Sequence, residues 1–111
     1  FKENVPDLRN TKVIDVIYGL QNRGLEVEVH DAHANVEEAQ ALYGIELKQD
    51  LGPSLRPDRY ACVVGAVSHV EYTTLAVDAL AGLVVPGGLV ADIKGMWRGL
   101  RLPEHLLRWH L

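Results

Sequence analysis

The chain has 111 residues, of which 48% are hydrophobic and 23% charged, a composition that fits one globular domain with one core and excludes a disordered chain. Its net charge of -4 argues against a non-specific nucleic-acid binder, which would normally be basic. The longest apolar stretches, such as residues 61–67, are far too short to span a membrane. We therefore expect neither a nucleic acid nor a membrane as partner.

Two further features bear on the cellular compartment. The first residues lack a basic segment followed by an apolar run, so no signal peptide is predicted. Cys62 is the single cysteine and cannot form an internal disulfide, which fits a reducing cytoplasm. We therefore expect a cytoplasmic protein. Because Cys62 lies inside an apolar run, we interpret it as a small buried hydrophobe and not as a nucleophile.

The chain opens on a polar loop and then enters a helix predicted over residues 11–23. The apolar residues at helical spacing in this segment are Val13, Val16, Ile17 and Leu20. Asn10 or Thr11 is the expected N-cap, and Gly24 sits where a C-terminal cap belongs.

The pattern then alternates between strand and helix. Residues 25–30 predict a strand that ends at Asp31, and residues 34–43 a short helix stopped by Gly44. A short edge strand is expected over residues 45–48.

The second half repeats this alternation after a loop predicted over residues 51–57. Residues 61–67 form a continuous apolar run, typical of a strand in the middle of a parallel sheet with both faces covered. A helix is predicted over residues 72–83, followed by a Pro-Gly-Gly turn at residues 86–88 and a strand over residues 89–93.

Residues 106–111 are interpreted as a final strand. The alternation predicts an α/β fold with an open parallel sheet and helices on both faces. A doubly wound domain normally begins with a central strand before its first helix, and this chain starts in the loop after that strand. We therefore expect a fragment of a larger protein whose sheet lacks its first strand, exposing an apolar slot between two neighbours.

In such sheets ligands bind beyond the carboxyl ends of the strands. Lys2 and Arg9 of the opening loop are candidates for an anion site, because a lysine can contact one phosphate while an arginine forks onto a second acceptor. The helix that follows adds a partial positive charge and free N–H groups. The alternative is a solvated lysine and a surface arginine paired with Asp7.

Lys94 is the second candidate, in the segment Asp92-Ile93-Lys94-Gly95 just past an apolar strand. A lysine at this place points into the ligand crevice, whereas the alternative is an ordinary lysine before a glycine turn. His69, which follows the apolar run of residues 61–67, is interpreted as structural rather than ligand-binding. The other histidines lie at spacings that fit no metal signature, so no metal site is predicted.

The opening segment resembles the start of the C-terminal domain of the UDP-glucose/GDP-mannose dehydrogenase family. The family pattern is close to Gly-Leu-x-Phe-Lys-x-x-x-x-Asp-x-Arg-x-Ser, and Phe1-Lys2, Asp7-x-Arg9 and Thr11 match it in register. The resemblance continues at Val29-His30-Asp31 and at residues 60–72. It covers nearly the whole chain, including the tail around Leu102-Pro103-Glu104 and Trp109.

The segment Asp92-Ile93-Lys94-Gly95 resembles the "D-x-K-G" of members that act on N-acetylated UDP-hexoses, where UDP-glucose members have "D-x-R". Because a lysine replaces that arginine, the bidentate geometry of the arginine does not carry over. Together with Glu3-Asn4, Lys94 favours UDP-GlcNAc or UDP-GalNAc over UDP-glucose as the substrate.

The resemblance implies a Rossmann-like domain, residues 1–111, of an NAD-dependent UDP-sugar 6-dehydrogenase, which oxidises the sugar C6 alcohol to a carboxylate for polysaccharide or surface-antigen synthesis. Phe1, Lys2 and Lys94 would bind the UDP-sugar, and Arg9 would reach the NAD. NAD would be held mainly by an N-terminal domain, and the catalytic cysteine by a middle domain. Both domains are absent here, so no catalytic residue is expected in this fragment and the isolated chain should be inactive. A homo-oligomer is also expected.

Two alternatives stay open. A stand-alone module that binds a nucleotide or a protein partner, without catalysis, would have the same fold. A different α/β domain, for instance a response-regulator-like or transferase domain, is the other. The absence of an acidic cluster at the strand ends argues against a receiver domain, which needs carboxylates to hold Mg²⁺.

Overall fold

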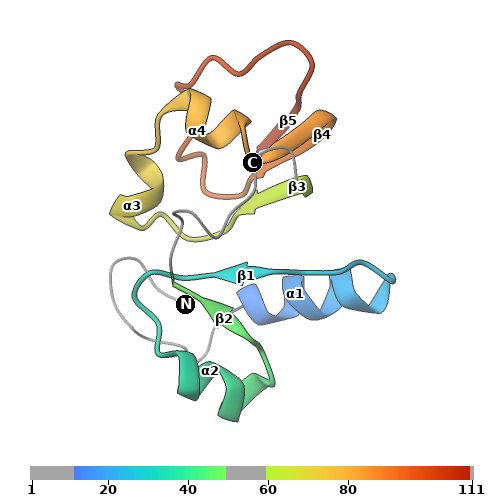
Figure 1. Cartoon of the computed structure of the whole chain (residues 1–111), viewed down its shortest axis with the longest axis vertical. Helices are drawn as coiled ribbons and strands as arrows, with labels where there is room; N and C mark the ends of the chain where they lie inside the picture. Colours follow the sequence, from blue (N-terminus) through green and yellow to red (C-terminus); the bar gives the residue numbers. More distant parts are fainter. Residues whose placement is uncertain (1–11, 50–59, 111) are drawn as a thin grey trace. The chain divides into compact units, whose positions relative to one another are not determined.

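The structure, a computed structural model, describes residues 12–49 and 60–110 of the chain (Figure 1). The chain divides into two compact units, Phe1–Leu51 and Gly52–Leu111. Both contain parallel strands joined through helices, which confirms the predicted α/β, Rossmann-like class. The described strands form a two-stranded sheet in the first unit and a three-stranded sheet in the second. The loop predicted over residues 51–57 lies outside the described residues.

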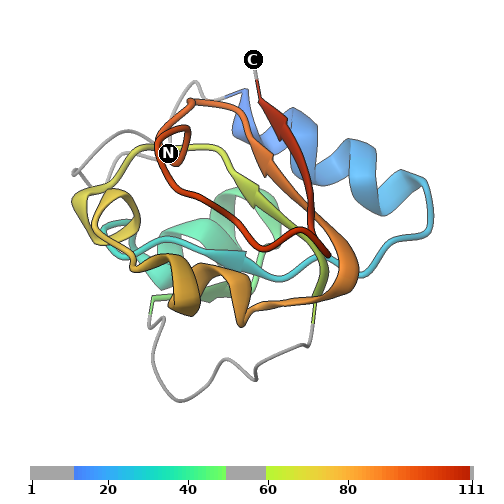
Figure 2. The same ribbon diagram turned by 90° about the horizontal axis from the view of Figure 1, so that it is seen from above.

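In the first unit, helix α1 (Val13–Asn22) is confirmed, but its buried face differs from the prediction. Ile14 and Ile17 are buried, whereas Val16 is 38% exposed. The predicted stop is confirmed, since Gly24 follows the helix with a φ of 82°, the left-handed conformation that glycine adopts without strain. Figure 2 shows α1 leading through this turn into the first strand.

The N-terminal end of α1 lies at the edge of the described residues. Lys12 occupies the N-cap position, and its side chain makes no capping hydrogen bond. The two predicted caps, Asn10 and Thr11, lie outside the described residues.

Strands β1 (Val29–His30) and β2 (Leu47–Lys48) pair in parallel, with Val29 opposite Leu47. Both are shorter than the sequence predicts. Beside these strands, Lys48 Nζ lies 3.5 Å from a Glu28 carboxylate oxygen, which makes an ion pair. Because both residues are partly exposed, this pair adds little to stability.

Helix α2 (Val36–Tyr43) connects these two strands and has well-defined ends. The Asn35 side chain accepts a hydrogen bond from the N–H of Glu38 at 2.8 Å. Gly44 ends the helix in the left-handed conformation, as predicted, and its N–H donates to the carbonyl of Gln40. Both ends of α2 are therefore encoded by residues that suit a helix cap.

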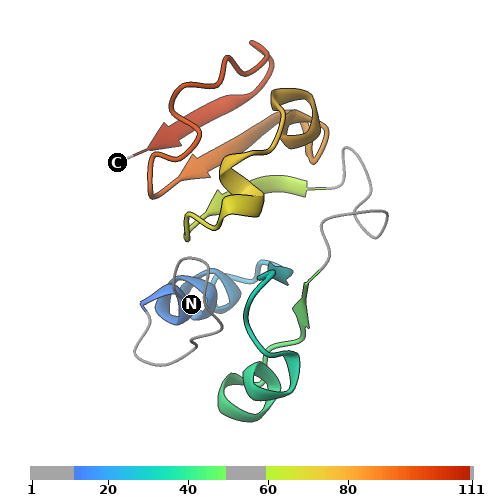
Figure 3. The ribbon, with the colours of Figure 1, turned by 90° about the vertical axis from the view of Figure 1, so that its left-hand side faces the viewer.

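The second unit contains β3 (Tyr60–Gly65), β4 (Val84–Asp92) and β5 (Leu107–His110), all parallel and in the order β3-β4-β5. Figure 3 shows the three strands side by side. The final strand is thus confirmed. Within the described residues β3 pairs with β4 alone, so it lies at the edge of its sheet and not in the middle.

The prediction that Cys62 is buried is wrong, because Cys62 is exposed in the structure. Partial burial nevertheless raises the pKa of the Cys62 thiol above its usual value, since desolvation disfavours the thiolate. A raised pKa is the reverse of what a nucleophilic cysteine needs.

The single helix predicted over residues 72–83 is two short helices, α3 (Val70–Thr73) and α4 (Val77–Ala81). The hydroxyls of Thr73 and Thr74 both donate to the carbonyl of Val70, at 3.2 and 2.7 Å. Side chains that take backbone acceptors in this way compete with the helix ladder. Two consecutive threonines therefore mark the place where α3 ends.

The Pro-Gly-Gly segment at residues 86–88 is part of β4 and not a turn between two elements. The register moves from Tyr60 opposite Val84 to Cys62 opposite Leu89, so β4 carries extra residues there as a bulge. Gly87 has a φ of 83°, and its N–H donates to the carbonyl of His105 at 2.7 Å.

The core of the second unit is one cluster that draws on α4, β4 and the loop after β4. Its buried members are Leu80, Val84, Val90, Trp97 and Leu106. Trp97, which is 4% exposed, contributes the largest side chain. This tryptophan lies just beyond the carboxyl end of β4, so its burial in the core also fixes the conformation of the loop at that strand end.

Candidate functional site

Lys94 lies two residues beyond β4, in an exposed position at the carboxyl end of the sheet of the second unit. This is the edge at which open parallel sheets bind ligands. The N–H of Ile93 donates to the carbonyl of Gly65 at 3.0 Å, which extends the β3–β4 pairing up to the residue before Lys94. Lys94 therefore follows an apolar strand, as the sequence predicts, and its place in a ligand crevice stays a prediction.

The loop that carries Lys94 is organised by Asp92, whose side chain is buried, with the residue 2% exposed. One carboxylate oxygen accepts from the N–H of Met96 at 3.0 Å, and the other accepts from the N–H of Trp97 at 2.8 Å. Hydrogen bonds to a carboxylate are stronger than those between neutral groups, and burial makes them costly to break. Asp92 thereby closes a tight loop around Lys94.

The conformation of this loop depends on two glycines, Gly95 within it and Gly65 at the end of β3. Gly95 has a φ of 70°, a backbone conformation that strains other residues. A Cβ on Gly65, at the end of β3, would lie 2.5 Å from both the Met96 Cε and the Trp97 Cζ3 atoms. The missing side chain of Gly65 is what lets Trp97 pack against β3.

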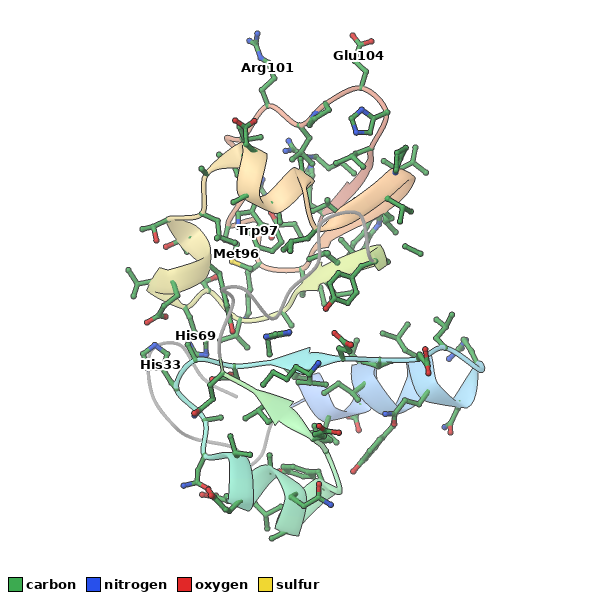
Figure 4. All side chains as sticks on the ribbon, in the orientation of Figure 1. His33, His69, Met96, Trp97, Arg101 and Glu104 are labelled. Atoms are coloured by element: carbon green, nitrogen blue, oxygen red, sulfur yellow. The ribbon has the colours of Figure 1, made fainter. Side chains whose placement is uncertain are left out.

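Trp97 is held from a third direction by the segment after β3. Its indole N–H donates to the carbonyl of Tyr72 at 2.9 Å. Figure 4 shows Met96 and Trp97 turned into the second unit, whereas Arg101 extends away from it. The Lys94 loop is thus fixed by a carboxylate, a glycine contact and an indole hydrogen bond.

His69 belongs to the structural support of this region, as the sequence predicts. It is fully buried and occupies the N-cap position of α3, although its side chain makes no capping hydrogen bond. Its ring lies against that of Tyr72, with the centroids 5.4 Å apart and the planes inclined by 44°.

The first unit has a comparable strand-end loop. Asp31, also 2% exposed, follows β1, and one of its oxygens accepts from the N–H groups of His33 and Ala34 at 2.9 and 2.8 Å. The side-chain amide of Gln49 donates to the carbonyl of Ala34 in the same loop. This loop runs directly into the N-cap of α2 at Asn35.

Three of the four predicted binding residues, Phe1, Lys2 and Arg9, lie outside the described residues. The structure therefore describes Lys94 alone of that set. Sequence reasoning missed the supporting roles of Asp92, Gly65 and Trp97. The usable signals were a glycine and an aspartate at the ends of adjacent apolar strands, where ligand-side loops begin.

The described residues at the strand ends do not fit the pyrophosphate of NAD. A dinucleotide approaches glycine backbone that leaves room for it. At the end of β3 the room beside Gly65 is filled by Met96 and Trp97.

Among residues 12–49 and 60–110, no group of three His, Cys, Asp or Glu side chains is placed to hold a metal ion. No helix in the described part of the chain is long and apolar enough to cross a membrane.

The profile of the UDP-glucose/GDP-mannose dehydrogenase family, UDP binding domain, matches residues 1–99. The chain therefore belongs to this family. It is 39% identical over 111 residues to the protein CapL of Staphylococcus aureus, covering all of this chain and 25% of CapL.

Two further relatives are named UDP-N-acetyl-D-glucosamine 6-dehydrogenase. The one from Pseudomonas aeruginosa is 33% identical over 96 residues and the one from Salmonella typhi 30% identical over 94 residues. Each alignment covers 85% of this chain and 21% of the relative. The chain thus spans about a fifth to a quarter of the length of the curated relatives it matches.

Proposed function

We propose that this chain is the UDP-sugar-binding part of an NAD-dependent UDP-sugar 6-dehydrogenase of the cytoplasm, serving polysaccharide or surface-antigen synthesis. The family match over residues 1–99 and the names of two relatives support this proposal. The observation that carries it is the exposed Lys94 in a loop fixed at the carboxyl end of β4. An ammonium held at a strand end is suited to a diphosphate.

The binding site on this chain has two parts in our proposal. Lys94 approaches the substrate from the β4 loop, and Phe1 and Lys2 contact it from the opening loop. Arg9 reaches the NAD, which is bound mainly by an N-terminal domain of the longer protein. The family resemblance assigns NAD to that domain, and the packed glycine at the end of β3 is consistent with this because it offers no cradle. The chemistry that NAD supplies when bound is hydride acceptance, and this chain's own share is binding and orienting the nucleotide sugar.

An N-acetylated UDP-hexose, UDP-GlcNAc or UDP-GalNAc, is the substrate we propose. The motif Asp92-Ile93-Lys94-Gly95 favours it, and two relatives carry UDP-N-acetyl-D-glucosamine in their names. Strict preference of the longer parent enzyme for UDP-glucose in a dehydrogenase assay would contradict this choice. The middle domain with the catalytic cysteine and a homo-oligomeric parent belong to the same proposal.

The test is a titration of UDP, UDP-GlcNAc and UDP-glucose into the 111-residue chain, followed by backbone amide chemical shifts. We expect UDP-dependent shifts at residues 92–97, and about tenfold weaker binding in Lys94→Ala because a charge-assisted contact is lost. Arg101→Gln is the matched control, since it removes one positive charge from an exposed side chain of the same unit. Equal affinities of the two variants would contradict the role of Lys94.

A further inference from the structure

Two side chains of opposite charge, those of Asp92 and Arg108, bind the backbone of the short turn that follows Lys94. At its beginning, the Asp92 carboxylate accepts the N–H groups of Met96 and Trp97. At its end, the Arg108 guanidinium donates to three backbone carbonyls. These carbonyls belong to Trp97, Arg98 and Leu100. A carboxylate on the N–H side and a guanidinium on the carbonyl side both complement the dipole of a turn.

Arg108 reaches the turn from a different strand. It lies in β5, opposite Val90 of β4, and ten residues separate it from Arg98. Two of its contacts measure 3.4 Å, to the carbonyls of Trp97 and Arg98, and the third, to Leu100, is shorter. The planar fork of an arginine places several N–H groups at fixed angles, which the single ammonium of a lysine cannot reproduce.

Within the turn itself, two backbone hydrogen bonds hold the chain. The N–H of Arg98 donates to Gly95 at 3.3 Å, and the N–H of Leu100 donates to Trp97 at 2.9 Å. Arg108 adds side-chain hydrogen bonds to the carbonyls of Trp97, Arg98 and Leu100. Its guanidinium therefore joins β5 to the Lys94 loop.

We propose that Arg108 is a positioning residue for nucleotide binding by Lys94. This inference rests on the proposed function above. Arg108 does not contact the ligand; it fixes the backbone beyond Lys94, as Asp92 fixes the backbone before and around it. A loop held in its binding conformation loses less conformational freedom when the ligand arrives, so binding is tighter.

The first test measures the turn without any ligand. Amide hydrogen exchange at Arg98 and Leu100 is compared among the unsubstituted chain, Arg108→Gln, Arg108→Lys and the control Arg101→Gln. We expect exchange at these amides to be about tenfold faster in Arg108→Gln, with a smaller effect in Arg108→Lys, because charged hydrogen bonds are lost or rearranged. Unchanged shifts of β3 amides verify that each variant is folded. Exchange equal to that of Arg101→Gln would overturn the proposal.

The second test uses UDP as the probe and asks whether Arg108 acts through Lys94. Arg108→Gln should weaken UDP binding in the unsubstituted chain and have no further effect in a Lys94→Ala background, since the ammonium it positions is gone. An undiminished effect of Arg108→Gln in the Lys94→Ala background would overturn the proposal. If the unsubstituted chain shows no UDP-dependent shifts, the proposed function fails, whereas the exchange experiment still decides whether Arg108 holds the turn.

Discussion

Each unit of the chain has a buried aspartate at the carboxyl end of a parallel strand, and the two aspartates organise their loops differently. Asp31 accepts from N–H groups two and three residues ahead, and the chain then enters α2. Asp92 accepts from N–H groups four and five residues ahead. Both residues are 2% exposed, so burial does not distinguish them.

The difference lies in what each loop encloses. The shorter loop at Asp31 connects β1 to α2, a helix that has its own cap. The longer span at Asp92 encloses Lys94 and Gly95 and ends on Trp97, a core residue. A loop closed on a core side chain can hold an exposed cation at a fixed place. The comparison teaches that a strand-end aspartate can enclose an exposed side chain in its loop when the residues it anchors are far enough along the chain.

The largest expected effect comes from Gly65→Ala, which tests whether the second loop depends on close packing against β3. The new Cβ would lie 2.5 Å from Trp97 and Met96 atoms, so the free energy of unfolding should fall by about 2 to 3 kcal/mol. Urea unfolding followed by the fluorescence of Trp97 and Trp109 reports this, because both tryptophans lie in the second unit.

Gly99→Ala is the matched control for this substitution. A Cβ on Gly99 meets no atom within 4 Å, so the urea midpoint should barely move. Similar midpoints for the two alanine variants would mean that Trp97 adjusts freely, and the loop would then lack the rigid support we describe.

The second prediction compares the aspartates directly. Asp92→Ala leaves one buried and one partly buried N–H group without their carboxylate acceptor, and should lower the free energy of unfolding of its unit by about 2 to 3 kcal/mol. Asp31→Ala also removes two hydrogen bonds, but we expect a smaller loss of about 1 to 2 kcal/mol because α2 retains its own cap.

The measurement for this pair is a urea titration followed by resolved amide resonances from each unit. Asp92→Asn serves as the control, since an amide oxygen still accepts one N–H while its NH₂ faces the other. Its stability should fall between those of the unsubstituted chain and Asp92→Ala. A greater loss from Asp31→Ala than from Asp92→Ala would reverse the comparison.

The helix ends and the position of Lys94 after its strand could be predicted from the sequence, because neighbouring residues determine them. Gly24 and Gly44 mark helix ends because glycine alone adopts their positive φ without strain. The place of Lys94 follows from an apolar strand ending in Asp92. These features depend on neighbours in the sequence, and they were predicted correctly.

The incorrect predictions concern contacts made across the fold. The apolar run around Cys62 predicts burial, but an apolar run does not show which of its side chains other elements cover, and Cys62 is exposed. The segment at residues 86–88 has turn chemistry, yet pairing with β3 makes it a bulge within β4. The support of Lys94 by Gly65 and Arg108 joins residues far apart in the sequence, which no local pattern reveals.

The smallest expected effects concern the helix caps, which also differ between the two units. In the first unit Asn35 caps α2 through its side chain. In the second unit Ala76 occupies the N-cap of α4 with an extended backbone, a φ of -67° and a ψ of 148°, and makes no side-chain cap. Asn35→Ala should therefore lower the free energy of unfolding of its unit by about 1 kcal/mol.

Ala76→Ser is the reciprocal change and should stabilise the second unit by about 0.5 to 1 kcal/mol, because the backbone already suits a capping hydroxyl and the site is exposed. The same urea titration, followed by amide resonances of each unit, measures both variants. Substitution of a cap residue in one unit should leave the urea midpoint of the other unit unchanged if the two units unfold separately. A shift of both midpoints together would show that the units unfold as one, and the two strand-end loops would then have to be compared as parts of a single cooperative structure.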